Sequence, residues 1–210
     1  MTRPPSTAGL HHVSVITGTA AQTVSFYAEV LGLRFVKQTV NYDDPFMHHV
    51  YFADERGSPG TLLTCFPFER GQEGDRVRYR TAAHGSDPGT VVDILDTNLP
   101  FGREGIGTAH HVAFRFEDET ALEAWRDLLV EDGLEPTYVK DRRYFQSVYV
   151  REPGGILVEL ATDGPGLTVD ESVESLGTGL RLPPWLEEDR AMITAQLPPV
   201  TAGEPSEDRE

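Results

Sequence analysis

The sequence repeats one pattern twice, and this repeat limits the folds open to the chain. A His-His pair opens an apolar run in "GLHHVSVIT" (9–17) and again in "GTAHHVAFRF" (107–116), about 98 residues later. Each run is followed by a segment with helical spacing of apolar residues, and then by segments with the composition of strands. The repeat therefore predicts two βαβββ modules that share one core.

The helical and strand segments of the two copies match in detail. Apolar residues recur every three or four positions in "TAAQTVSFYAEVLGL" and in "DETALEAWRDLLVEDGL", and each segment closes on a glycine, a common helix stop. Further along, "HVYFADERGSPGTLLT" (49–64) aligns with "SVYVREPGGILVE" (147–159). This alignment makes Thr64 the counterpart of Glu159.

The repeat predicts a division of the chain into five parts. Residues 1–68 and 107–163 form the two βαβββ modules, and 69–106 form a linker with an inserted β-hairpin around "HGSDPG". Residues 164–200 form a C-terminal extension with a short helix after a Pro-Pro pair, and the polar stretch 201–210 is expected to be a disordered tail. The predicted fold class is α+β, with the paired modules forming a curved sheet or barrel.

Charge and composition favour a small molecule as the partner. The formal net charge is -16, which argues against nucleic acid and anionic membranes, because both attract a positive protein face. No apolar stretch approaches the roughly 20 residues of a membrane span, and the first residues lack the pattern of a secretory signal. We therefore expect a cytoplasmic protein. With a single cysteine, Cys65, a metal would have to be held by imidazole and carboxylate.

Strand alternation assigns the two histidines of each pair to opposite faces of the sheet. The apolar residues that follow share a face with the first histidine, His11 or His110, and this face is expected to meet the helix of its own module. The second histidine of each pair, His12 or His111, then points toward the concave side. The repeat thus predicts that His12 and His111 lie on the same side of the sheet.

The last strand of the second module supplies an acid to this pair. Glu159 is embedded between Val158 and Leu160, and a buried glutamate is rare unless it is paired. Two histidines and one carboxylate with open positions are the donor set of non-haem iron(II) oxygenases. We therefore predict a metal site of His12, His111 and Glu159 that holds Fe(II), with Mn(II) as a second candidate.

The other histidines have simpler interpretations. A single histidine at a strand start is more often packed or exposed than a ligand, but two at equivalent positions with a matching acid favour a metal. His48 and His49 precede a strand and lack counterparts in the second copy, so we expect structural or pocket-wall roles. His84 is expected in a solvated turn. The chain contains no GxGxxG, P-loop or GxSxG pattern, so phosphate binding and nucleophilic hydrolysis lack support.

The chain resembles the vicinal oxygen chelate superfamily, which includes glyoxalase I, extradiol dioxygenases and antibiotic-binding resistance proteins. The resemblance is closest to the hydroquinone ring-cleaving dioxygenase branch and extends over most of the chain. It is carried by "GLHHVSVITGTAAQTVSFYAEVLGLRFVKQTVNYDDP", "HHVYFADERGSPGTLLTCFPF", "GTAHHVAF", "DRRYFQSVYVREPGGILVELATDGPG" and "LGTGLRLPPWLE".

The resemblance implies roles for individual residues. It places the iron ligands at His12, His111 and Glu159, in agreement with the strand argument. It also implies catalytic roles beside the substrate for the first histidine of each pair, for an arginine in "DRRYF" and for a tyrosine in "SVYVREP"; these residues are His11, His110, Arg142 and Tyr149. The simpler alternatives are a surface salt bridge for Arg142 and core packing for Tyr149.

The chain departs from the family in length. Family members carry four such modules, whereas this chain joins the first module to the end of the third and to the whole fourth, so the barrel closes alone or through a homodimer. The resemblance implies a dioxygenase whose partners are O2 and a small hydroquinone-like or catechol-like aromatic diol. The alternatives are a glyoxalase-like metal-dependent isomerase or lyase, which usually needs a second carboxylate where Thr64 stands, and a metal-free, resistance-type protein that binds an aromatic ligand.

Overall fold

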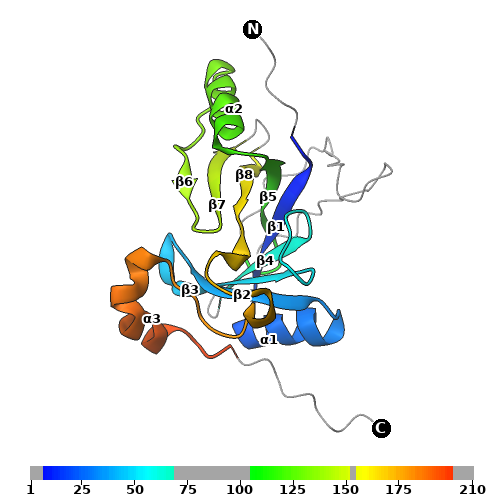
Figure 1. Ribbon diagram of the computed structural model, residues 1–210, viewed down its shortest axis with the longest axis vertical. Helices are drawn as coiled ribbons and strands as arrows, with labels where there is room; N and C mark the ends of the chain where they lie inside the picture. The colour runs from blue at the N-terminus through cyan, green and yellow to red at the C-terminus, as the bar shows by residue number, and fades with distance from the viewer. Residues whose placement is uncertain (1–6, 69–104, 152–154, 201–210) are drawn as a thin grey trace.

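The structure, a computed structural model, describes residues 7–68, 105–151 and 155–200 (Figure 1). The hairpin predicted within 69–106, together with His84, and the tail predicted at 201–210 lie outside the described residues, apart from the last two residues of the linker.

The described strands form one eight-stranded sheet in the order β2-β3-β4-β1-β5-β8-β7-β6. The first half consists of β1 (Leu10–Thr17), β2 (Arg34–Asn41), β3 (Asp44–Ala53) and β4 (Leu62–Pro67). The second consists of β5 (Ala109–Phe116), β6 (Lys140–Asp141), β7 (Phe145–Arg151) and β8 (Leu157–Pro165). In each half the first and last strands pair in parallel, and the antiparallel pair β1–β5 joins the halves. The predicted α+β fold of paired βαβββ modules is confirmed.

Each half has its helix where the repeat predicts it. In the first half, α1 (Ala20–Val24) continues as a π-helix (Ser25–Val30). In the second, α2 (Glu119–Glu131) begins after Asp118, whose carboxylate accepts a backbone N–H of the first turn. It is followed by Gly133, whose positive φ of 82° suits a residue without a Cβ.

Three apolar clusters fix the sheet. One packs α1 on its own half around Val24 and Phe52, and a second packs α2 around Leu122 and Leu160. The third lies between the halves and includes Tyr51 of β3 with Tyr144 and Phe145 of the second module. The two modules therefore share one core.

The C-terminal extension contains three 3-10 helices, Leu167–Val169, Val173–Ser175 and Pro184–Asp189, and the helix α3 (Arg190–Gln196). Ile193 of α3 is buried in a cluster that includes a residue of β2. α3 follows the Pro-Pro pair of the extension, six residues after Pro184. Within the described residues, no helix combines the length and the apolar character that a bilayer span needs.

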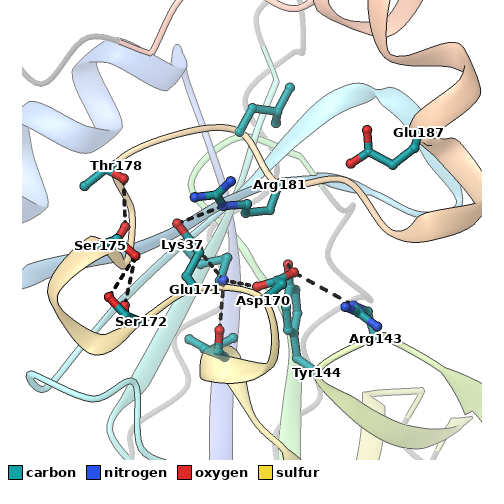
Figure 2. A network of polar contacts seen from close by, with 12 residues as sticks. Lys37, Arg143, Tyr144, Asp170, Glu171, Ser172, Ser175, Thr178, Arg181 and Glu187 are labelled. Atoms are coloured by element: carbon teal, nitrogen blue, oxygen red, sulfur yellow. Dashed lines mark hydrogen bonds and ion pairs between the residues drawn. The ribbon is translucent and has the colours of Figure 1, made fainter.

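A buried polar network ties this extension to the sheet (Figure 2). The ammonium of Lys37 in β2 is fully buried, donates to Leu167 O at 2.9 Å and to Asp170 Oδ1 at 2.8 Å, and also contacts the Glu171 carboxylate. Lys37 Nζ also lies 4.7 Å from the centre of the Tyr144 ring, and the Tyr144 hydroxyl donates to Asp170 Oδ2 at 3.1 Å. The network therefore joins β2, the extension and the turn that precedes β7.

Candidate metal centre

The His-His pair of β1 contains a β-bulge. The pairs with β5 on either side are Leu10 with Phe114 and His12 with Ala113, so β1 advances by two residues where β5 advances by one. His11 is the extra residue. A bulge interrupts the alternation of side chains along a strand and often lies beside an active site.

The pair of β5 contains the matching irregularity. Here the flanking pairs are Ser14 with His111 and Val15 with Ala109, so β5 has the extra residue, His110. Two bulges therefore lie at equivalent positions on the two central strands.

The bulges correct the prediction that His11 and His110 lie on the face opposite their neighbours. The Nδ1 atom of His11 lies 2.9 Å from Nδ1 of His12, and the same atoms of His110 and His111 lie 2.7 Å apart. His110 also lines the cavity described below. Strict alternation was wrong at these two positions because each bulge adds one residue to its strand.

The structure brings together the three predicted ligands, His12, His111 and Glu159, and all three are buried. The two Nε2 atoms lie 2.9 Å apart, and Oε2 of Glu159 lies 3.0 Å from that of His12 and 2.8 Å from that of His111. Among the described residues, no other group of three histidine, cysteine or acidic side chains has ligand atoms that converge in this way. The donors come from β1, β5 and β8, hence from both modules.

The triangle of donor atoms fits a divalent metal ion. Donors about 2.1 Å from an ion and about 90° apart lie about 3.0 Å from one another, whereas tetrahedral donors lie about 3.4 Å apart. The observed separations of 2.8 to 3.0 Å are close to the first value, so the three side chains would fit as donors to one ion.

The electrostatics of the cluster also suit a metal, because bound ligands must be deprotonated. Burial alone would raise the pKa of Glu159, but His12 and His111 hold that pKa well below the usual range of a glutamate. Burial lowers the pKa of His111 to about 4, although Glu159 opposes this shift. Near neutral pH the cluster therefore offers a carboxylate and a neutral imidazole.

A cavity of about 630 Å³ opens beside the cluster, a size typical of small-molecule sites. Its walls are largely aromatic and apolar. The rings of His49 and Phe66 stack with their centres 4.1 Å apart and 20° between their planes. The other aromatic side chains of the wall are Tyr42, Tyr51, Phe68, Phe145 and Tyr149.

His48 and His49 lie within β3 rather than before it, and their environments differ. The Nε2 atom of His48 lies 2.7 Å from Pro198 O, which is a structural contact. His49 lines the cavity, and its Nε2 lies 2.9 Å from Thr64 Oγ1. Thr64 in turn lies 2.6 Å from Ser14 Oγ, which is 2.9 Å from Nε2 of His111. A chain of hydrogen bonds thus links the cavity wall to a candidate ligand.

Arg142 and Tyr149 also line the cavity. The Tyr149 ring lies 5.7 Å from that of His111, and the Arg142 guanidinium carbon lies 5.1 Å from the centre of the Tyr149 ring. Arg142 pairs with Asp43 at 2.9 Å, but its side chain is only 14% exposed, so it belongs to the cavity wall and not to the outer surface. Burial, with a further contribution from Glu159, raises the pKa of Tyr149, which keeps the phenol neutral. His11 is not among the lining residues.

Several lining residues were not anticipated from the sequence, among them Asp43, Lys140, Phe66 and Phe145. Lys140 could have been found, because it stands two residues before Arg142 and alternate residues of an extended segment share a face. Asp43 comes from the other module, and no feature of its local sequence distinguishes it.

Paired βαβββ modules with converging donors across their central strands define a vicinal-oxygen-chelate type of protein. Residues 9–160 match the model of the Glyoxalase/Bleomycin resistance protein/Dioxygenase superfamily, and the chain belongs to this superfamily.

Two similar proteins carry the names of dioxygenases. A Bacillus subtilis protein provisionally named ring-cleaving dioxygenase MhqE is 30% identical over 300 aligned positions, covering 91% of this chain and 99% of the relative. Chlorohydroquinone/hydroquinone 1,2-dioxygenase of Sphingobium indicum is 25% identical over 308 positions, covering 89% of this chain and 95% of the relative. These alignments are longer than the 210 residues of the chain, so they include positions of the relatives that have no counterpart here.

A solved structure supports the same grouping. A crystal structure of a Bacillus subtilis protein provisionally described as a dioxygenase matches with a TM-score of 0.83 at 27% identity, covering 95% of this chain and 99% of that chain.

Proposed function

We propose that this protein is a ring-cleaving dioxygenase that binds iron(II) through His12, His111 and Glu159 and acts on a hydroquinone-like or catechol-like diol. The observation that carries the proposal is the convergence of these three buried donors beside an aromatic cavity. The names of the relatives support the reaction class.

The number of donors favours the dioxygenase over the isomerase alternative. Thr64 occupies the position equivalent to Glu159, and its hydroxyl is engaged by Ser14 and His49. The cluster therefore has three donors, which would leave open positions on a bound ion for exogenous ligands. When bound, iron(II) would supply the open positions and the one-electron chemistry that allow O2 to react with an aromatic diol.

The side chains of the cavity would bind and orient the diol. The stacked pair of His49 and Phe66 offers a flat wall for an aromatic ring. The Arg142 guanidinium supplies a positive charge on the wall for an anionic group of the substrate. Burial, and then the neighbouring His12, lower the pKa of His49 well below that of a free histidine, so His49 is neutral, and its two ring nitrogens contact the hydroxyl groups of Thr64 and Tyr51. His110 is a second histidine on the cavity wall that could hold a proton.

The test combines metal analysis with oxygen uptake. The protein is purified anaerobically, its metal content is measured, and iron(II) is added before hydroquinone or catechol is supplied in air-saturated buffer. We expect about one iron per chain and diol-dependent oxygen uptake, both lost in His12→Ala, His111→Ala and Glu159→Ala. His48→Gln is the matched control, since His48 is buried, contacts Pro198 and is not one of the three converging residues.

Two results would contradict the proposal and favour an alternative function. Metal binding without oxygen uptake for either diol would favour the isomerase or lyase. Absence of metal, combined with binding of aromatic ligands, would favour a resistance-type binding protein.

A further inference from the structure

The charged side chains on the cavity wall have the opposite balance to the chain as a whole. The chain has 18 basic and 34 acidic residues, yet the described charged residues of the wall are two cations, Lys140 and Arg142, and one acid, Asp43. Asp43 lies between the cations, 2.9 Å from Arg142 Nη2 and 3.6 Å from Lys140 Nζ. One carboxylate cannot neutralise both, and the other acid that acts on Arg142, Glu159, belongs to the cluster and would be neutralised by the bound ion, so this part of the wall carries an excess positive charge in the metal-loaded protein.

Arg142 has a further unmet requirement. Its Nε atom is buried and has no hydrogen-bond partner among the described residues, although the guanidinium keeps its charge at any pH a protein tolerates. A buried N–H of a charged group without an acceptor is unfavourable. This part of the cavity therefore lacks an acceptor that a bound anion could provide.

The cationic pair lies close to the candidate metal cluster. The Tyr149 ring contacts the ring of His111, and Arg142 Cζ and Lys140 Nζ lie 5.1 and 5.9 Å from its centre. The same tyrosine ring thus contacts both the cations and a ligand of the cluster. A benzene ring whose hydroxyl groups face the cluster can extend a substituent toward Lys140 and Arg142.

We propose that Lys140 and Arg142 form a subsite for an anionic substituent, so that the preferred substrate is a diol with a carboxylate on its ring. This inference rests on the proposed function. The planar guanidinium fork matches the two oxygens of a carboxylate, and the Lys140 ammonium adds a second charge. Long-range repulsion by the acidic surface is screened within about 10 Å at ordinary salt, so contacts inside the cavity dominate.

The first test measures binding without turnover. The iron(II)-loaded protein is titrated anaerobically with 2,5-dihydroxybenzoate and with hydroquinone, which differ only by the carboxylate. We expect the carboxylated diol to bind at least about tenfold more tightly, in line with a charged hydrogen bond, and this preference to shrink as salt rises. Equal affinities, or tighter binding of hydroquinone, would overturn the inference.

Two variants shift the preference in opposite directions. Lys140→Met should weaken binding of 2,5-dihydroxybenzoate roughly tenfold and change that of hydroquinone little. Asp43→Asn removes the competing carboxylate and should tighten binding of 2,5-dihydroxybenzoate. Arg190→Gln, which removes an equal charge from α3 outside the cavity, is the control and should change neither affinity. The same change for both ligands in Lys140→Met and in Asp43→Asn would show that the two residues only support the fold.

The outcomes separate this inference from the proposed function. Oxygen uptake with hydroquinone but no carboxylate preference would retain the dioxygenase and reject the anionic subsite. A salt-sensitive carboxylate preference in a protein that consumes no oxygen with either diol would retain the subsite and reject the dioxygenase.

Discussion

Thr64 and Glu159 hold equivalent positions in the two halves of the sheet. Thr64 pairs in parallel with Ser14, and Glu159 pairs in parallel with Ala113. Each of these partners stands two residues after a histidine of the cluster. The duplicated scaffold therefore offers two places for a carboxylate beside the candidate metal, and the chain uses one of them.

A second carboxylate, introduced at position 64, should change the donor set from three protein ligands to four. In Thr64→Glu the new carboxylate lies beside the cluster, and we expect metal affinity to be kept or increased. Oxygen uptake should fall by about 100-fold or more, because a position that an exogenous ligand requires is taken by the protein. Isothermal titration with Mn(II) and an oxygen electrode measure the two effects. Thr64→Val, which removes the hydroxyl without adding a donor, is the control, and equal losses of oxygen uptake in both variants would contradict the argument.

Metal binding should stabilise the fold, because the donors come from strands of both modules. A ligand that binds only the folded state at about 100 times its dissociation constant adds about 2.7 kcal/mol to the free energy of unfolding. We therefore expect Mn(II) or anaerobic iron(II) to raise the melting temperature by several degrees. The increase should vanish in Glu159→Gln, which keeps the size of the side chain. A similar increase in that variant would show that the ion binds elsewhere.

The metal-free protein should lose stability in mild acid. Burial lowers the pKa of His11 and of His111 from the ordinary 6.5 to about 4, so the unfolded chain binds more protons than the folded chain between these values. Stability is then present above pH 6.5 and is lost as the pH falls toward 4. In this window each histidine lowers the free energy of unfolding by about 1.4 kcal/mol for each pH unit of acidification. Urea unfolding with a chelator at pH 7, 6 and 5 measures the slope, and an unchanged free energy of unfolding would contradict these shifts.

Breaking the network around Lys37 should destabilise the protein strongly. In Lys37→Met the partner carboxylates lose their shared cation, but Glu171 keeps a contact with Arg181 at 3.0 Å, so we expect a loss near the lower end of the about 3 to 5 kcal/mol that an uncompensated buried charge costs. Arg190→Gln breaks an exposed pair with Glu187 and should cost less than about 1 kcal/mol. Chemical unfolding of both variants gives the comparison. Equal stabilities would show that the buried pair contributes no more than the exposed one.

The single cysteine should be inert in the folded protein. Burial raises the pKa of the Cys65 thiol to about 12, so little thiolate is present at pH 8, and the thiol is fully buried. We expect alkylation by iodoacetamide to be at least about 100-fold slower than for an exposed thiol. The thiol should react at the ordinary rate in concentrated urea. Rapid modification of the folded protein would show that β4 opens locally.

Much of the fold followed from periodicity and from the repeat. The shared pattern of the two copies predicted the order of strands and helices and the equivalence of Thr64 and Glu159. Alternation also gave the faces of His12 and His111 correctly, since both face the cluster. These predictions succeed because the apolar face of each strand must meet its own helix, which leaves the other face to the site.

The remainder depended on features that local sequence does not encode. Nothing in either His-His run distinguishes a bulged strand from a regular one. Alternation alone therefore assigned His11 and His110 to the wrong face of the sheet. The meeting of Asp43 with Lys140 and Arg142 depends on how the two modules dock. The burial of Lys37 could not be predicted from the local sequence either, because its partners lie more than a hundred residues away along the chain.

Because β1 pairs with β5, the convergence of the three candidate metal ligands depends on how the two modules dock. His12 is fixed in one module, whereas His111 and Glu159 are fixed in the other, so the three donors converge only when that seam is in register. A substitution that disturbs the β1–β5 pairing far from the donors should therefore weaken metal binding even when each module keeps its fold. The affinity of the ion thus reports the integrity of an internal interface as well as the identity of its ligands.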